Sequence, residues 1–387
     1  MNSAHSNSKG FDCVIVGCGP AGGYLGYLIS SLGLKCLILE KRVAPRYKPC
    51  GGGLTRRAMD LLPFSLDGVI EDMALKAEVG FGEGVEAATV TDHPMIGLVM
   101  RDKFDSFLAG KAASAGATIL DDTVFETATA AHGGGLDIHT SKGVFKTLML
   151  AGADGVNSRV AKALGLWKNR VGCPAIEAEV YPSSDELLER YRGSVHFDFG
   201  AAPKGYGWVF PKADHLSVGV FSTDRKANGL KNALVRYLSL KGLDSSRAKG
   251  PRGHMIPLGP RGGPFATKNG LLIGDAAGLA DPITGEGIYH ALRQAEIAAR
   301  CISDAIKGPK GDLSTYNRLI DKEFNGELKY ARRLGFLLYG LPRLSRALIR
   351  RGGERVLACH LDIITGRSSY KKIFFKAINP GNLLPFI

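Results

Sequence analysis

The residues best suited to chemistry in this 387-residue chain are glycines and a carboxylate spaced to bind a nucleotide. Gly17-x-Gly19-x-x-Gly22 follows the apolar run 11–16, and Glu40 ends a second apolar run. Glycines let the backbone approach a pyrophosphate, and the N–H groups at a helix N-terminus bind its oxygens. A carboxylate at the end of the next strand accepts hydrogen bonds from a ribose. The spacing therefore predicts a site for ADP.

A second glycine-rich segment, residues 270–288, distinguishes FAD from NAD. Asp275 follows the buried-type run 271–273 and can accept hydrogen bonds from a polyol such as a ribityl chain. Gly287 precedes a helix predicted over 288–299, whose N-terminus can stabilise the electron-rich edge of an isoalloxazine. The two segments together predict FAD.

The segment 45–54 should emerge at the carboxyl edge of the sheet, where ligands bind in open α/β folds. The three successive glycines 51–53 are costly in backbone entropy, which indicates a loop that must approach something flat. Cys50, beside them, is either a thiol near the flavin or a small buried apolar residue. Its type alone does not decide between the two.

Three aromatic residues, Tyr206, Trp208 and Phe210, alternate along a predicted strand and so share one face. A turn at 212–215 and a return strand over 216–222 complete a hairpin. The aromatic face is either ordinary core packing or an apolar slot for a long hydrocarbon.

These signals predict an α/β fold assembled from separated segments. Residues 10–72, 100–165 and 262–308 form a discontinuous Rossmann-like FAD-binding domain. Residues 73–99 and 166–261 form an antiparallel β-sheet substrate domain, as their alternating pattern indicates. A basic helical region follows over 309–387.

Composition narrows the class of protein. The formal net charge is +13, and many cationic residues after position 328 alternate with apolar ones. Such helices bind an anionic lipid surface or an acidic protein, or form a solvated face. Seven scattered cysteines with no zinc spacing indicate a reducing cytosol and no metal. With no signal peptide, no apolar run of about 20 residues and no nucleic-acid module, we expect a cytoplasmic protein, at the inner membrane face if the tail binds lipid.

Two motifs carry a family resemblance. The segments PRYKPCGGG and YGWVFPKADHLSVGV resemble the geranylgeranyl reductase family, within the group that shares the p-hydroxybenzoate hydroxylase fold. The resemblance implies that reduced FAD hydrogenates isolated C=C bonds of isoprenoid chains on lipids, prenylated quinones or chlorophyll-type esters. Gly219 matches the first glycine of the family's Gly-x-Gly pattern, but Phe221 replaces the second. That replacement bears on the shape of the hydrocarbon channel and the chain length accepted.

Motif matching extends to single residues. Tyr206, Trp208 and Phe210 would line the substrate channel, with Cys50 near the reacting end of the flavin. The residues implied to contact FAD are Ala21, Glu40, Cys50, Gly51, Gly53, Arg101, Phe125, Asp275, Gly287 and Ile288.

An isolated alkene is a poor hydride acceptor, so the site must exclude water and supply a proton as well as a hydride. We hypothesise that reduced flavin delivers the hydride and that Cys50, or an ordered water beside Tyr206, supplies the proton. The electron donor would be NAD(P)H, docking transiently because only one nucleotide fingerprint exists, or an acidic ferredoxin.

Other functions fit the same FAD half. One is a flavin monooxygenase acting on an aromatic substrate, and another is a flavoprotein that binds isoprenoid without turnover. A flavin halogenase fits less well, because the lysine that such enzymes place before the aromatic motif has no convincing counterpart.

Overall fold

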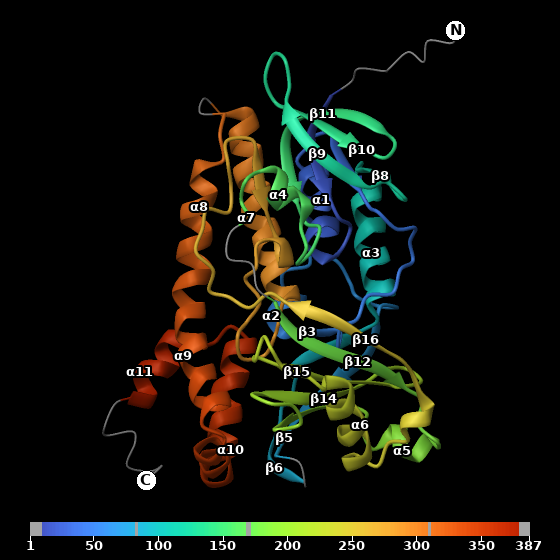
Figure 1. The fold of residues 1–387 in the computed structure, drawn as a ribbon, viewed down its shortest axis with the longest axis vertical. Helices are drawn as coiled ribbons and strands as arrows, with labels where there is room; N and C mark the ends of the chain where they lie inside the picture. The colour runs from blue at the N-terminus through green and yellow to red at the C-terminus, as the bar shows by residue number, and fades with distance from the viewer. Residues whose placement is uncertain (1–9, 82–83, 168–171, 309–310, 379–387) are drawn as a thin grey trace.

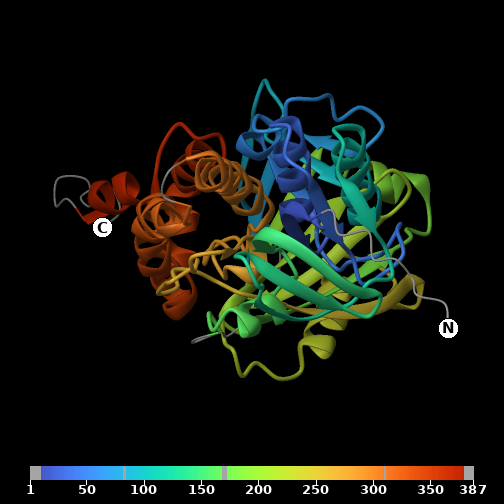
Figure 2. The same ribbon diagram turned by 90° about the horizontal axis from the view of Figure 1, so that it is seen from above.

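The computed structural model describes residues 10–81, 84–167, 172–308 and 311–378 (Figure 1). Two large sheets lie one above the other along the long axis, and the C-terminal helices run beside them (Figures 1 and 2). Among the described residues, no helix combines the length and apolar character needed to cross a bilayer.

The first sheet has seven strands and carries the predicted fingerprint. Its central strands are buried on both faces, as parallel strands covered by helices are. All its neighbouring pairs are parallel except those on the two sides of β10. In spatial order the strands are β8 (Thr118–Leu120), β2 (Cys36–Leu39), β1 (Phe11–Val16), β11 (Gly143–Gly152), β10 (Leu136–Thr140) and β9 (Phe125–Ala130), with β17 (Gly270–Leu272) beside β11.

Helices pack on this sheet and begin where the sequence indicates. One of them begins at Pro20, inside the glycine fingerprint and directly after Gly19, because proline is favoured in a first helical turn. Another begins after Ser158, whose hydroxyl accepts the Ala161 N–H at 2.9 Å and so caps the helix. These helices are α1 (Pro20–Ser31), α3 (Arg101–Ser114), α4 (Arg159–Ala163) and α7 (Ile288–Lys307), which extends beyond the predicted 288–299.

The second sheet also has seven strands, and one pair departs from the antiparallel pattern expected from sequence. β13 and β5 run parallel, and the chain between them passes through the first sheet and then through β12 of the second sheet. In spatial order the strands are β16 (Ala248–Ile256), β12 (Cys173–Val180), β15 (Leu216–Ser222), β14 (Gly205–Pro211), β13 (Ser194–Phe199), β5 (Lys76–Gly80) and β6 (Val85–Val90).

Alternation gives the second sheet two different faces. One face packs Val209, Val218 and Val220 under α6 (Leu230–Leu240). The other face carries aromatic side chains toward the first sheet and the C-terminal helices. The predicted hairpin of β14 and β15 is therefore confirmed, with its aromatic side chains on the inner face.

Part of the segment 73–99 lies outside the second sheet. Its strand at 96–99 pairs instead with the glycine segment after Cys50 on one side and with the strand 70–74 on the other, and the Val99 N–H donates to the Gly52 carbonyl at 2.9 Å. This small sheet consists of β3 (Gly53–Thr55), β7 (Ile96–Val99) and β4 (Ile70–Ala74), with the short helix α2 (Arg56–Met59) after β3.

The C-terminal region is helical, as its pattern predicts. These helices stand beside both sheets in two perpendicular views (Figures 1 and 2). The longest bends at Gly352 and packs on β6, where a β-carbon at Gly353 would lie 2.3 Å from that of Ala87. The helices are α8 (Ser314–Ile320), α9 (Gly326–Gly340), α10 (Pro342–Ile364) and α11 (Tyr370–Ile378). Outside this region, the short helix α5 (Asp185–Glu189) follows β12 and precedes β13 along the chain.

Candidate active site

The turn between β1 and α1 is built for close backbone approach. Gly17 has a φ of +100°, and a β-carbon at Gly22 would lie only 1.8 Å from the Gly17 carbonyl oxygen. Gly19 precedes α1 without any side-chain cap, so the first N–H groups of the helix stay open to a ligand. The turn thus provides the anion site that a pyrophosphate requires.

Glu40 lies over this turn. It is buried, its Oε2 accepts the Cys18 N–H at 2.9 Å, and its Oε1 accepts the Arg42 N–H at 3.2 Å. The guanidinium of Arg46 lies 3.1 Å from the same carboxylate. The carboxylate therefore stands beside the fingerprint, at the position predicted for a ribose partner.

Two guanidinium groups add positive charge beside Gly19. A β-carbon at Gly19 would lie 3.7 Å from Arg101 Nη2 and 3.8 Å from Arg46 Nη2. Asp105 holds both arginines, at 2.8 Å from Arg101 Nε and 3.2 Å from Arg46 Nη1. Burial opposes the charge of Arg101, but Asp105 and Cys50 raise its pKa above the ordinary value. Fixed positive charge at this place favours phosphate.

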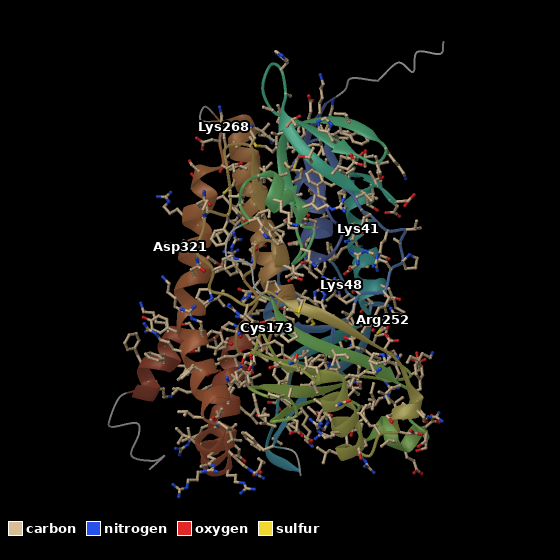
Figure 3. The ribbon with its side chains drawn as sticks, in the orientation of Figure 1. Lys41, Lys48, Cys173, Arg252, Lys268 and Asp321 are labelled. Carbon is tan, nitrogen blue, oxygen red and sulfur yellow. The ribbon has the colours of Figure 1, made fainter. Side chains whose placement is uncertain are left out.

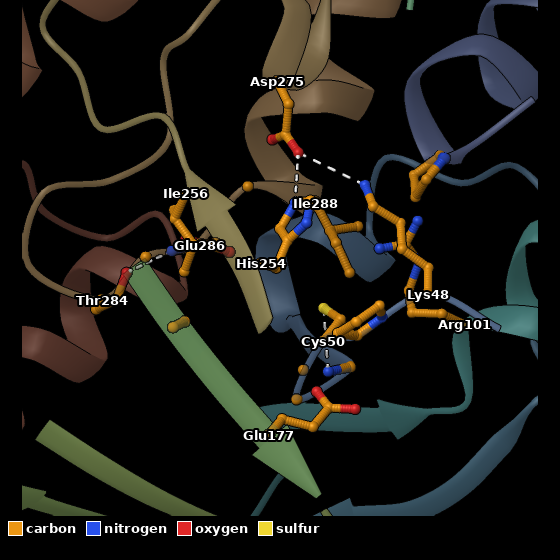
Figure 4. Close-up of a pocket in the computed structure, with 18 of the residues that line it drawn as sticks. Lys48, Cys50, Arg101, Glu177, His254, Ile256, Asp275, Thr284, Glu286 and Ile288 are labelled. Atoms are coloured by element: carbon orange, nitrogen blue, oxygen red, sulfur yellow. Dashed lines mark hydrogen bonds and ion pairs between the residues drawn. The ribbon is translucent and has the colours of Figure 1, made fainter. Parts of the chain in front are cut away.

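Asp275 lies where β17 ends and faces the same space. Its Oδ2 is 3.5 Å from Lys48 Nζ and 3.6 Å from His254 Nε2 (Figure 4). Burial tends to raise the Asp275 pKa, but Lys48 and His254 bring it well below its usual range. Gly287 precedes α7 without a side-chain cap, so the α7 N-terminus is also open beside this carboxylate.

The loop after Cys50 is fixed from beneath by a buried lysine. Lys212 Nζ donates to the carbonyls of Gly51 and Val99 at 2.8 and 3.0 Å, and burial lowers its pKa to about 8. The Gly52 N–H donates to the Cys50 sulfur at 3.4 Å (Figure 4). The loop therefore presents a thiol among hydrogen-bond donors.

The aromatic side chains of β14 pack directly against this loop. A β-carbon at Gly51 would lie 3.0 Å from both the Phe210 ring and Trp208 Nε1. The Phe197 ring centroid is 5.7 Å from that of Tyr206 and 5.5 Å from that of Phe210. The result is a continuous apolar wall.

Two residues of the return strand shape that wall. A β-carbon at Gly219 would lie 2.1 Å from the Trp208 indole, so only glycine lets the ring lie across β15. Phe221 is fully buried with its ring 5.5 Å from that of Tyr206. The side chain that replaces the family's second glycine thus fills space behind the Tyr206 ring.

The hydroxyl of Tyr206 is already engaged. It donates to the Thr284 carbonyl in the turn that leads to α7. Burial raises the Tyr206 pKa above its ordinary value, so the hydroxyl keeps its proton at neutral pH. Tyr206 thereby joins the aromatic wall to the Asp275 side of the site.

One cavity collects most of the residues singled out in the sequence. Gly17, Gly22 and Glu40 shape the turn beside it. Phe125 does not line it: its ring is buried in the core of the first sheet, so an adenine contact there stays a prediction. The predicted residues that line the cavity are Gly19, Ala21, Cys50, Gly51, Gly53, Arg101, Tyr206, Trp208, Phe210, Asp275, Gly287 and Ile288.

Several residues of this site were not predicted from the sequence. Lys48 and Arg252 lie at the level where the two sheets meet (Figure 3). Glu177 and Lys212 are charged residues on strands or at their ends, and each is buried. The alternation in β12 that turns Glu177 inward was the available signal. His360 and Ile364 of α10 also line the cavity, and nothing in their helix indicated it.

The donor set fits a flavin dinucleotide. Two open helix N-termini and the flanking cations suit a pyrophosphate, the two carboxylates suit ribose and ribityl hydroxyls, and the glycine loop leaves room for a flat ring. The apolar wall adjoins the glycine loop, so a hydrocarbon and a redox cofactor can meet in one cavity.

Sequence comparison supports the same cofactor. The model of the FAD-binding-domain family matches residues 11–202. The chain is also 30% identical over 321 residues to the digeranylgeranylglycerophospholipid reductase of Methanocaldococcus jannaschii, and the match covers 77% of this chain and 78% of that protein.

Solved structures share the fold. A geranylgeranyl bacteriochlorophyll reductase-like protein from Thermoplasma acidophilum superposes with a TM-score of 0.76 at 23% identity, covering 97% of this chain and 99% of that one. The flavin-dependent brominase Bmp2 superposes with a TM-score of 0.74 at 20% identity, covering 96% and 98% of the two chains. The architecture thus hosts more than one flavin chemistry, and the site must distinguish them.

Proposed function

Because this chain belongs to the geranylgeranyl reductase family of FAD-binding oxidoreductases, we propose that it saturates C=C bonds in the isoprenoid chains of a lipid. The observation that carries the proposal is a single cavity with two chemically different walls. The residues suited to FAD lie on one side, and Tyr206, Trp208 and Phe210 lie on the other.

The chain's own residues divide the work of the reaction. Bound FAD, once reduced, supplies a hydride. The aromatic wall holds an alkene in a space from which water is excluded, so that the double bond stays oriented. Gly51 and its neighbours keep the Cys50 loop close to that wall.

Cys50 is our proposed proton donor. The anion left on its sulfur would be stabilised by the Gly52 N–H, by the Arg101 guanidinium and by the buried ammonium of Lys212. Tyr206 lines the slot and orients the substrate, since its hydroxyl is bonded to the Thr284 carbonyl.

Mass spectrometry of lipid that co-purifies with the protein tests the substrate class. An isoprenoid lipid should be found. When that lipid is added, the anaerobically reduced protein should regain its flavin absorbance at about 450 nm. The product should carry two more hydrogens for each bond reduced. Stoichiometric oxygen uptake with a hydroxylated product would show a monooxygenase instead, and a flavin never reoxidised by polyprenyl lipid would show a binding protein. Parallel assays with NADPH and with reduced ferredoxin identify the electron donor.

Replacing Phe221 by alanine should change which chain length is preferred. The space opened behind Tyr206 lets its ring retreat, so the ratio of kcat/KM for geranylgeranyl over farnesyl substrates should rise about tenfold. The lost packing should lower the free energy of unfolding by about 3 kcal/mol. Val220→Ala, on the opposite face of β15, should lower stability without altering the ratio, and an unaltered ratio in Phe221→Ala would contradict the role.

We also propose that the turn between α9 and α10 rests on an anionic membrane. Phe336, near the end of α9, is 70% exposed, and the inner sides of both helices pack through Tyr339 and Ile364 on the aromatic inner face of the second sheet. We call this the α9–α10 surface; it comprises exposed Phe336, Leu337, Leu341 and Leu344 with Arg332, Arg333 and Arg343.

Flotation with vesicles tests this surface. The protein should float with phosphatidylglycerol vesicles and not with phosphatidylcholine vesicles, and added salt should weaken the binding because it screens the arginines. The double variant Phe336→Ser/Leu344→Ser should stay at the bottom of the density gradient, because it no longer binds the vesicles. Val144→Ser removes an exposed apolar residue of β11, far from this surface, and should float normally (Figure 1). Equal flotation of both variants would contradict the assignment.

A further inference from the structure

Glu177 is a buried carboxyl in the cavity wall near Cys50. Its side chain points from β12 toward the Cys50 loop (Figure 4), and the residue is only 4% exposed. One oxygen, Oε1, accepts the hydroxyl of Tyr47, and Oε2 has no hydrogen-bond partner among the described residues. Buried polar atoms in proteins nearly always have a hydrogen-bond partner, so an unsatisfied buried oxygen at a reaction cavity indicates a functional role.

The strand register places this carboxyl beside the substrate wall. Glu177 pairs with Gly219, and Gly219 pairs with Trp208, so the three stand in one row across β12, β15 and β14. Because Gly219 has no side chain, the Trp208 indole extends across β15 toward Glu177. The carboxyl therefore adjoins both the indole and the Cys50 loop.

A polar route connects the same carboxyl with solvent. Tyr47, which donates to Glu177, is only partly buried. Its ring lies under the exposed guanidinium of Arg252, with 4.1 Å between the guanidinium carbon and the ring centroid. Glu177 thus has one oxygen toward the cavity and one toward a hydroxyl near the surface.

The surroundings keep this carboxyl close to its titration point. Burial raises the Glu177 pKa to about 7, and the Tyr47 hydroxyl and the Lys212 ammonium limit the rise. A group that is half protonated near neutral pH can both give and take a proton. The titratable or charged groups facing it are Tyr47 and Cys50 from the loop after β2, Lys212 after β14, Glu179 on β12 and Arg252 on β16.

We propose that Glu177 is the proton reservoir that reprotonates Cys50 after each turnover. The proposal rests on the proposed function, in which the S–H bond of Cys50 breaks as a C–H bond forms. The O–H bond of Glu177 then breaks as the S–H bond forms again, directly or through one bound water. The Glu177 carboxylate regains its proton from solvent along Tyr47, and no electrons move in these two transfers.

Comparing one turnover with many tests the reservoir. Reduced enzyme mixed anaerobically with digeranylgeranyl glycerophospholipid in micelles reports the first turnover, and excess dithionite allows many. In Glu177→Gln the first turnover should stay within about twofold of wild type, while the steady-state rate should fall about 100-fold. The wild-type steady-state rate should decline as the pH rises through about 7, because the carboxyl then lacks the proton it must give, and the Gln variant should lose this decline.

Control variants and an infrared titration complete the test. Glu179→Gln, a less buried change on the same strand, should keep the wild-type rates, with the pH decline at slightly lower pH because the Glu179 charge raises the Glu177 pKa, and Glu177→Asp should recover part of the steady-state rate. The infrared band of a protonated carboxyl should disappear between about pH 6 and pH 8 in wild type and be absent from Glu177→Gln. An unchanged steady-state rate, an equal loss of the first turnover, or no such band overturns the reservoir. A wild-type protein that never oxidises with this lipid overturns the substrate assignment instead, and the infrared titration still decides whether Glu177 is the titrating carboxyl.

Discussion

Replacing Gly19 by valine should yield a folded protein that binds FAD at least about 100-fold more weakly, a loss of about 2.8 kcal/mol. The atoms nearest to a β-carbon at Gly19 would be the side-chain ends of Arg101, Arg46 and Asp105, at 3.7, 3.8 and 3.9 Å, which is ordinary contact, so the fold can accept a side chain. That side chain would stand on the open N-terminus of α1, where we expect the pyrophosphate to bind. Fluorescence titration with FAD and the absorbance of the purified protein measure the effect.

Substitutions of two other glycines serve as controls for this result. Gly110→Ala in α3 places a methyl group with no atom within 4 Å, so it should bind FAD as wild type does. Gly22→Ala places one 1.8 Å from the Gly17 carbonyl oxygen, so it should disturb the turn itself and lower the melting temperature as well. Full FAD affinity in Gly19→Val would mean that the phosphates bind elsewhere.

Replacing Cys50 by alanine should leave FAD binding intact and slow the first anaerobic turnover at least about 100-fold, because the alkene loses the proton donor that we propose. The donors around the sulfur, the Gly52 N–H among them, would remain but have no anion to stabilise. Stopped-flow reoxidation of the reduced protein by polyprenyl lipid measures the rate.

The matched control is Cys359→Ala in α10. Cys359 is also a free, partly buried thiol, but it does not line the cavity. Its removal should leave the rate unchanged. If Cys50→Ala reacts as fast as wild type, the proton comes from another group, and the reservoir at Glu177 loses its recipient.

The FAD side of the site was predictable because its signals are local in sequence. The turn depends on the positive φ of Gly17 and on the close backbone approach at Gly22, while Glu40 follows directly on a buried strand and Asp275 comes three residues after another. The two segments had only to be recognised as halves of one site. The hairpin that carries Tyr206 was predictable for the same reason, since alternation and turn lie within a few residues.

The polar network beneath Cys50 was not predictable in this way. Tyr47 and Glu177 meet because β12 passes under the glycine loop, and Lys212 reaches the Gly51 carbonyl from the end of β14. No local pattern records such contacts between distant segments. The parallel pair of β13 and β5 was missed likewise, because alternation shows which residues face the core and not the direction of a neighbouring strand.

The preferred length of the isoprenoid substrate and the midpoint potential of the flavin should be hard to engineer separately in this protein. The Tyr206 ring contacts the hydrocarbon side of the cavity, while its hydroxyl fixes the turn that ends at Gly287. A substitution that moves this ring also moves the N-terminus of α7 and the partial positive charge it offers to an anionic ring. Variants selected for a shorter or longer tail should therefore be screened for their midpoint potential from the first round.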